Sequence, residues 1–235
     1  MFVIRRSEDR EHVTGGDRES WKTFSPGGQA SEFGAAFGAL DGLDEIQLAP
    51  GAGAEEDPQR DAEIVSYVAY GALVERDSLG RVNLLQAGDF RRTFLNHGLR
   101  RSEKNASGTD PARIFHVALG PAEPPGDPGL ERKRFPVADR RGALCCVASP
   151  DRRAGSLGLG QDARVYSAIL ARGQHVVHEI LRGRMAWLHL VTGALALDGL
   201  SLGTGDGVGM RSDASLSFRA SEDTEVLLID LVAPV

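Results

Sequence analysis

Short apolar or alternating runs, separated by turn signals, make up most of this chain, and few segments show a helical period. Many short strands with regular turns are typical of a sandwich, barrel or jelly roll. The pattern therefore predicts an all-β protein with few short helices. The runs that predict strands are Ile64–Val68, Leu73–Glu75, Ile114–Leu119, Val165–Leu170, Ala186–Val191, Ala194–Leu197 and Val226–Val232.

Turn residues stand between these runs. Asp77-Ser78-Leu79-Gly80 and Asp198-Gly199 each follow an apolar run, and Asp-Gly in that setting is a strong hairpin signal. Gly203-Thr204-Gly205-Asp206-Gly207 superficially resembles a phosphate-binding loop. It precedes neither a helical pattern nor Gly-Lys, so we interpret it as a turn of a barrel.

The chain repeats itself weakly. Tyr67–Val74 resembles Leu190–Ala196 with a small shift, and each is followed by a hairpin. A Gly-Asp pair comes next in both halves, at Gly88-Asp89 and at Gly205-Asp206, and each half then ends on an apolar strand. This ordered set predicts one supersecondary unit used twice, as in a duplicated β-barrel.

A segment rich in proline and glycine separates the two halves. Gly120–Gly129 holds four prolines and three glycines in ten residues, a composition that does not pair in a central strand. We therefore expect a crossover here, with an N-terminal barrel near residues 1–125 and a C-terminal barrel near residues 126–235.

Composition and charge narrow the functional classes. The 235 residues are 41% hydrophobic and 26% charged, and the net charge is −6. This balance opposes direct binding of nucleic acid or of an anionic membrane, both of which need a concentrated basic face. The simplest interpretation of the local basic stretch is a solvated strand or loop; it consists of Arg91, Arg92, Arg100, Arg101 and Lys104.

The cysteines and the N-terminus bear on the compartment. Cys145 and Cys146 are adjacent, so a bridge between them would be strained, and we expect both to be reduced. The residues that follow Met1 lack the apolar run that is typical of a signal peptide. No apolar stretch of the sequence is long enough to span a membrane. The sequence predicts a cytoplasmic protein.

Several segments resemble the pirin family, whose members are bicupins. Trp-x-Thr-Phe-Ser, His-Pro-His-x-Asp-x-Glu-Ile, Asp-Ser-x-Gly and Gly-x-x-His-Ser-Glu-x-Asn are the family patterns concerned. The matching segments are Glu19–Ser25, Asp57–Ile64, Asp77–Gly80 and Gly98–Asn105, followed by Ser149–Asp151, Gly155–Leu157 and Gln161–Tyr166 in the second half. The resemblance implies two cupin-type β-barrels with a metal pocket in the N-terminal one.

In the family, that metal is typically held by three histidines and one glutamate. The corresponding positions here are Asp57, Gln59, Arg101 and Glu103, so only the carboxylate remains. Arginine has no lone pair to offer a metal, and oxygen donors hold soft transition metals poorly. We therefore expect no metal or other cofactor. The alternative is one divalent ion, Fe, Ni, Cu, Mn or Zn. His116, within an apolar strand, is expected to be a core histidine with a hydrogen-bond partner.

Three functions follow from the resemblance. The first is a binding or regulatory protein without the family's metal, whose partner is another protein or a small molecule in the N-terminal barrel. The alternative is a quercetin 2,3-dioxygenase-like oxidoreductase that uses a metal in the same barrel. The third is metal-free binding or catalysis of a small molecule inside the barrel, with Glu103 as acid or base. This role requires a raised pKa of Glu103, whereas a neighbouring arginine lowers that pKa.

One hypothesis concerns the emptied pocket itself. Arg101 and Glu103 are i and i+2 on a predicted strand and share one face. We expect Arg101 to replace the lost cation, with a nitrogen within ~2.7–3.2 Å of an oxygen of Glu103 or Asp57.

Overall fold

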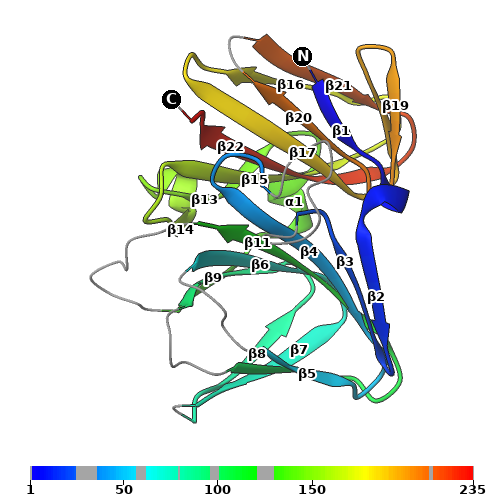
Figure 1. Cartoon of the computed structure of the whole chain (residues 1–235), viewed down its shortest axis with the longest axis vertical. Coiled ribbons are helices and arrows are strands. Elements are labelled where there is room, and N and C mark those ends of the chain that lie inside the picture. The colour runs from blue at the N-terminus through cyan, green and yellow to red at the C-terminus, as the bar shows by residue number, and fades with distance from the viewer. Residues whose placement is uncertain are drawn as a thin grey trace. The chain divides into compact units, whose positions relative to one another are not determined.

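The structure is a computed structural model that describes residues 2–24, 36–56, 62–78, 80–95, 101–120, 130–211 and 214–234, with backbone alone at 54–56, 95 and 214. Within these residues, helix is limited to α1 (Val137–Arg140) and the 3-10 turns η1 (Ser7–Asp9) and η2 (Arg153–Gly155). The prediction of an all-β chain with few short helices is confirmed (Figure 1). No helix in the described part is long and apolar enough to cross a bilayer.

The described chain divides into two compact units. The N-terminal barrel comprises Glu11–Gly28 and Leu40–Arg134. Its larger sheet has the strand order β12 (Glu131–Arg134), β9 (Asp89–Leu95), β6 (Ala62–Tyr70), β11 (Ala112–Leu119), β4 (Leu40–Leu48), β3 (Arg18–Lys22) and β2 (Glu11–Gly15). Its smaller sheet has the order β5 (Gly53–Glu56), β10 (Arg101–Asn105), β7 (Ala72–Asp77) and β8 (Val82–Gln86).

The C-terminal barrel comprises Met1–Arg10, Gln29–Ala39 and Phe135–Val235. Its larger sheet has the order β1 (Phe2–Arg5), β20 (Gly207–Arg211), β17 (Arg184–Thr192), β22 (Thr224–Val232), β15 (Ala163–Leu170), β13 (Cys145–Ser149) and β14 (Leu157–Gly158). Its smaller sheet has the order β16 (His175–Ile180), β21 (Ala214–Ala220), β18 (Ala194–Leu197) and β19 (Leu200–Gly203). All seven predicted strand runs lie inside strands of the structure.

The two barrels repeat one another at the glycine turn that ends the first strand of each repeat. Gly71 lies between β6 and β7 with φ 78°, and Gly193 lies between β17 and β18 with φ 91°. A Cβ on either residue would meet backbone, at 2.6 Å from Pro111 O and at 2.4 Å from Asp223 O respectively. Only glycine suits both the left-handed conformation and the close approach.

The Gly-Asp turns also correspond. Asp89 Oδ2 accepts a hydrogen bond from the Gln86 amide at 2.9 Å, and Asp206 Oδ2 accepts one from the Gly203 amide at 3.0 Å. In each barrel the aspartate thus closes the turn before the next strand. The Gly203–Gly207 segment is a barrel turn, as predicted.

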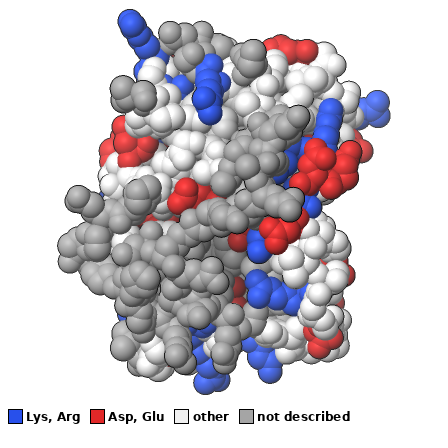
Figure 2. Space-filling model, in the orientation of Figure 1, with Lys and Arg blue, Asp and Glu red and all other residues white. Residues whose placement is uncertain are grey.

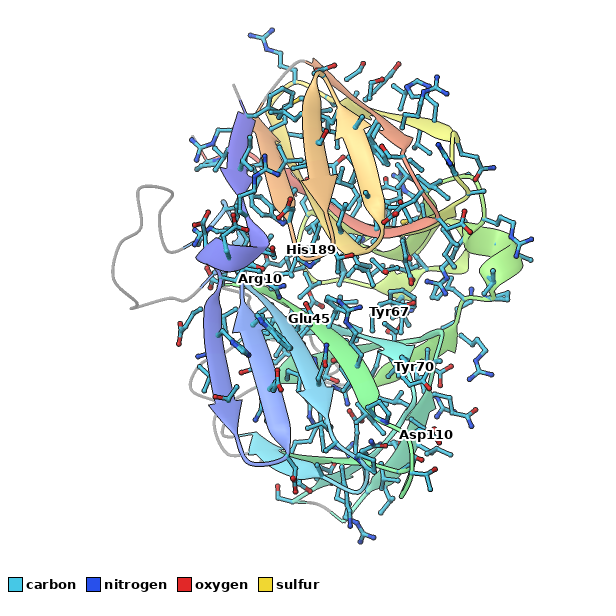
Figure 3. The ribbon with its side chains drawn as sticks, turned by 90° about the vertical axis from the view of Figure 1, so that its right-hand side faces the viewer. Arg10, Glu45, Tyr67, Tyr70, Asp110 and His189 are labelled. Carbon is cyan, nitrogen blue, oxygen red and sulfur yellow. The ribbon has the colours of Figure 1, made fainter. Side chains whose placement is uncertain are left out.

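Both faces of the larger N-terminal sheet are buried at its central strands, β6, β11 and β9. Val68 and Ile114 belong to the apolar cluster inside the barrel. On the opposite face, Tyr67 of β6, labelled in Figure 3, stacks on Phe90 of β9. Their ring centroids are 4.3 Å apart. Side chains alternate along each strand, so a polar residue on either face of this sheet needs a partner.

The boundary of 125/126 remains an expectation from sequence, because residues 121–129 lie outside the described part. Two strands belong to a barrel on the opposite side of this boundary from their own position in the sequence. β1 pairs with β20 of the C-terminal barrel, and β12 pairs with β9 of the N-terminal barrel. Strand pairing over such a sequence separation leaves no local signal.

Candidate functional site

Two of the four pocket positions lie on β10 and face the interior of the N-terminal barrel. Arg101 is 5% exposed and Glu103 is 3% exposed. Their i, i+2 spacing on a strand gives them this common face. Asp57 and Gln59 lie outside the residues that the structure describes.

Three basic side chains surround the Glu103 carboxylate. Oε1 lies 3.4 Å from Arg91 Nη2 and 3.6 Å from Arg101 Nη2, and Oε2 lies 3.3 Å from His116 Nε2. Arg101 is therefore inside the barrel rather than in water. Its distance to Glu103 is that of an ion pair and exceeds the hydrogen-bond length expected from sequence.

Ser66 of β6 contacts both Arg91 and His116 through its hydroxyl group. It lies directly opposite both, across β6–β9 and β6–β11. Arg91 Nη2 donates to Ser66 Oγ at 2.9 Å, and Ser66 Oγ lies 2.9 Å from His116 Nδ1. With the contacts to Glu103, the four side chains close a ring. His116 is a buried histidine with a hydrogen-bond partner, as expected.

These contacts indicate which ring nitrogen of His116 carries a proton. The Glu103 carboxylate, 3.3 Å from Nε2, would repel an unprotonated nitrogen, so it favours the neutral form with its proton on Nε2 and with Nδ1 as acceptor for Ser66. A protonated His116 carries protons on both nitrogens. Nε2 therefore bears a proton in either state, directed at the carboxylate.

The same neighbours keep Glu103 ionised. Burial alone raises the pKa of Glu103, but His116, Arg101 and Arg91 outweigh it and hold that pKa well below its usual range. A carboxylate that stays ionised at neutral pH has no proton to deliver and is a weak base. The arrangement opposes Glu103 as an acid–base catalyst.

A second carboxylate shares the interior. Glu75 of β7 lies directly opposite Glu103 of β10, and its Oε1 forms an ion pair with Arg91 Nη1. Glu75 is 1% exposed and Arg91 is fully buried. Because Arg91 contacts both acids, it reduces the repulsion between two facing carboxylates.

The interpretation of the basic stretch as solvated is wrong for three of its members. Arg91, Arg92 and Arg101 are 0%, 4% and 5% exposed, while Lys104 is exposed; Arg100 lies outside the described residues. Arg92 Nε donates to Glu63 Oε1 at 2.7 Å on the outer face of the sheet. The sequence contained a signal for this burial. Arg91 and Arg92 are adjacent, so on a strand they point to opposite faces and one of them must enter the barrel.

The C-terminal barrel is apolar where the N-terminal one is charged. Aligning Gly71 with Gly193, Asp89 with Asp206, and the paired strands with each other gives corresponding positions. Ser66, Glu75, Arg91, Arg101, Glu103 and His116 correspond to Leu188, Leu197, Val208, Leu216, Phe218 and Leu228, all members of one buried apolar cluster. The polar cluster is thus particular to one copy of the repeat.

A smaller polar group lies in the C-terminal barrel. His178 Nε2 lies 2.8 Å from Asp230 Oδ2, and Arg184 Nε donates to the other oxygen of Asp230. Arg184 Nη1 also reaches Asp162 at 2.9 Å. Burial raises the pKa of Asp230, but His178 and Arg184 more than offset this, so that pKa is lowered.

The described donors do not fit a divalent cation. A metal on Glu103 would lie ~2.0–2.2 Å from a carboxylate oxygen, close to two guanidinium groups that carry no lone pair and repel a cation. His116 turns a protonated nitrogen to the same carboxylate. Among the described residues, no group of three or more His, Cys, Asp or Glu has the geometry to hold a metal ion.

The chain consists of two β-barrels that repeat one another, which is the architecture of a bicupin. The N-terminal barrel has a buried polar cluster in its interior. Residues 5–117 match the family model described as Pirin, and residues 146–231 match the one described as Quercetinase C-terminal cupin domain. A protein named quercetin 2,3-dioxygenase from Escherichia coli (strain K12) is 32% identical over 231 residues, which cover 98% of this chain and 99% of that protein. The chain belongs to the pirin family.

Other relatives agree. A pirin-like protein of Caulobacter vibrioides is 32% identical over 195 residues, 83% of this chain and 84% of its own. The crystal structure of YhhW from Escherichia coli matches with a TM-score of 0.88 and 30% identity, covering 100% of this chain and 99% of that one. Bacterial pirin YhhW in complex with nickel(II) matches with a TM-score of 0.87 and 30% identity over the whole of both chains.

Proposed function

We propose that this pirin-family bicupin does not use the family's metal and acts as a binding or regulatory protein. The observation that carries the proposal is the Glu103 carboxylate, which Arg91, Arg101 and His116 already surround. These side chains supply the positive charge that a metal supplies in a metal-binding relative. Charge balance inside the barrel then requires no ion.

The alternative function is a quercetin 2,3-dioxygenase-like oxidoreductase with one divalent metal in the N-terminal barrel. The names of several relatives favour it. The two guanidinium groups beside Glu103 oppose it, because a cation placed on that carboxylate would face both of them. At the family-equivalent positions, Asp57, Gln59 and Arg101 stand where the resemblance places histidines.

Metal content tests the proposal. The full chain would be purified without a metal-binding tag and examined by elemental analysis, and then titrated with nickel(II) in a calorimeter. The Escherichia coli pirin that forms a nickel(II) complex is the positive control. We expect far less than one metal per chain and no saturable nickel binding; stoichiometric metal overturns the proposal.

Oxygen uptake with quercetin tests the alternative directly. The protein would be incubated with ferrous, nickel, copper or manganese ions before the flavonol is added. We expect no turnover above that of the free ion. Turnover that rises with the metal content of the protein would establish the dioxygenase instead.

We also propose a cytoplasmic location and no direct binding of nucleic acid. Cys145 and Cys146 are not joined in a disulfide, which suits a reducing compartment. On the face shown in Figure 2, the described basic and acidic residues are interspersed. Cell fractionation tests the location, and membrane-bound protein would contradict it. A gel shift with duplex DNA tests nucleic-acid binding, and a shifted band would contradict its proposed absence.

A further inference from the structure

We propose that the outer face of the β5–β10–β7 sheet binds a small organic anion with an apolar body, such as an aromatic carboxylate. A cavity of about 480 Å³ lies there, within the usual ~300–1,000 Å³ of small-molecule sites. Its lining residues are Gly53, Val74, Arg76, Ser102, Glu103, Lys104, Asn105 and Ala106. The site lies outside the barrel, so it does not depend on the proposed absence of metal inside.

Strand register assembles the polar side of this cavity. Arg76 of β7 lies directly opposite Ser102 of β10, and Val74 lies opposite Lys104. These four side chains alternate with Glu75 and Glu103, which point into the barrel, so they share the outer face. An arginine, a hydroxyl and a lysine thus converge on one patch of sheet.

Gly53 keeps the cavity open on the β5 side. It pairs with Lys104 across β5 and β10. A Cβ at Gly53 would lie 3.2 Å from Glu103 O and 3.6 Å from Lys104 Cβ. The absence of a side chain at Gly53 avoids a tight contact with the Glu103 carbonyl and leaves the stem of Lys104 uncovered on the β5 side.

The described lining favours an anion. Arg76 and Lys104 are exposed and basic, while the side chain of Glu103 is 4% exposed and committed to the interior cluster. Asn105 is likewise buried, and its side-chain amide donates to the Leu48, Ala49 and Asp110 carbonyls. Glu103 and Asn105 consequently meet the cavity through backbone. The residue paired with Ser102 on β5 is Glu55, so the patch carries two basic residues, Arg76 and Lys104, against one acidic residue.

An apolar strip beside the cations favours an organic ligand over an inorganic ion. On β8, Leu84 lies opposite Val74 and Val82 lies opposite Arg76. Leu84 is 46% exposed and Val82 is 55% exposed. Exposed apolar side chains that adjoin a cavity are typical of ligand sites. A carboxylate would pair with Arg76 or Lys104 while its ring covers Val74.

Calorimetric or ligand-observed NMR titration of the full chain with benzoate tests the proposal. Phosphate and benzyl alcohol are the comparison probes, since one lacks the apolar body and the other lacks the charge. We expect benzoate to bind roughly tenfold more tightly than either. Benzoate affinity should also fall as salt screens the charges.

Variants assign the site. Arg76→Gln and Lys104→Gln should each weaken benzoate binding by roughly five- to tenfold, and Gly53→Leu should block it by filling the space. Lys133→Gln, an exposed lysine on β12 away from the lining, is the matched control and should leave the affinity unchanged. No saturable benzoate binding, equal binding of phosphate, or affinity that all the lining variants retain overturns the inference.

Discussion

Glu103 and Phe218 occupy corresponding positions in the two barrels, and each is buried in the interior of its own. Around Phe218 the interior is an apolar cluster, whereas around Glu103 it is a set of ion pairs. Burying charge costs free energy even when it is paired. The N-terminal barrel therefore retains an arrangement that packing alone does not require.

Arg91 should be the side chain on which the interior cluster depends most. Arg91→Met leaves two facing carboxylates, Glu75 and Glu103, without their shared partner, and should lower the free energy of unfolding by about 3–5 kcal/mol. Denaturant unfolding measures the change. Lys22→Met, which removes an exposed pair with Glu11, is the control and should cost below about 1 kcal/mol. Equal effects of the two substitutions would contradict a special role for Arg91.

Arg101→Met should cost less than Arg91→Met. Arg101 lies 3.6 Å from Glu103, and the carboxylate keeps Arg91 and His116 after the substitution. We expect a loss of about 1–3 kcal/mol, because a buried charge then loses one of several partners. A loss above that of Arg91→Met would restore Arg101 as the main replacement for the cation.

Replacing the cluster by its C-terminal counterparts should not destabilise the protein. The variant carries Ser66→Leu, Glu75→Leu, Arg91→Val, Arg101→Leu, Glu103→Phe and His116→Leu. Apolar replacement of a complete buried ion-pair network is often neutral or stabilising by about 1–4 kcal/mol. Unfolding in guanidinium chloride gives the comparison, and a loss greater than about 2 kcal/mol would show that packing differs between the barrels.

Asp230 should make stability depend on acid pH. Its folded-state pKa is lowered by His178 and Arg184 against the effect of burial, so its contribution is present above the unfolded pKa of about 3.9 and is lost as pH falls through the folded value. The difference in unfolding free energy between wild type and Asp230→Asn should shrink below about pH 4. Exposed Asp17→Asn serves as the control, and a difference constant down to pH 2 would reject the assignment.

The strands were predictable because their signals are local. Alternating apolar residues and turns such as Asp198-Gly199 specify each hairpin within a few residues. The interior cluster was only half predictable. Arg101 and Glu103 share a face by spacing alone, but Arg91 and His116 join them only through the β9–β6–β11 register. Residues far apart in sequence set that register, and no local pattern reports it.

The pairings of β1 and β12 have a consequence for the order in which the chain folds during synthesis. Phe2 is synthesised long before its partner Met210, which belongs to β20. The N-terminal barrel also waits for Glu131–Arg134 before its edge is complete. An unpaired strand edge on a nascent chain is open to wrong partners. β1 is therefore made well before β20 and can take its place in the sheet only after β20 has been synthesised.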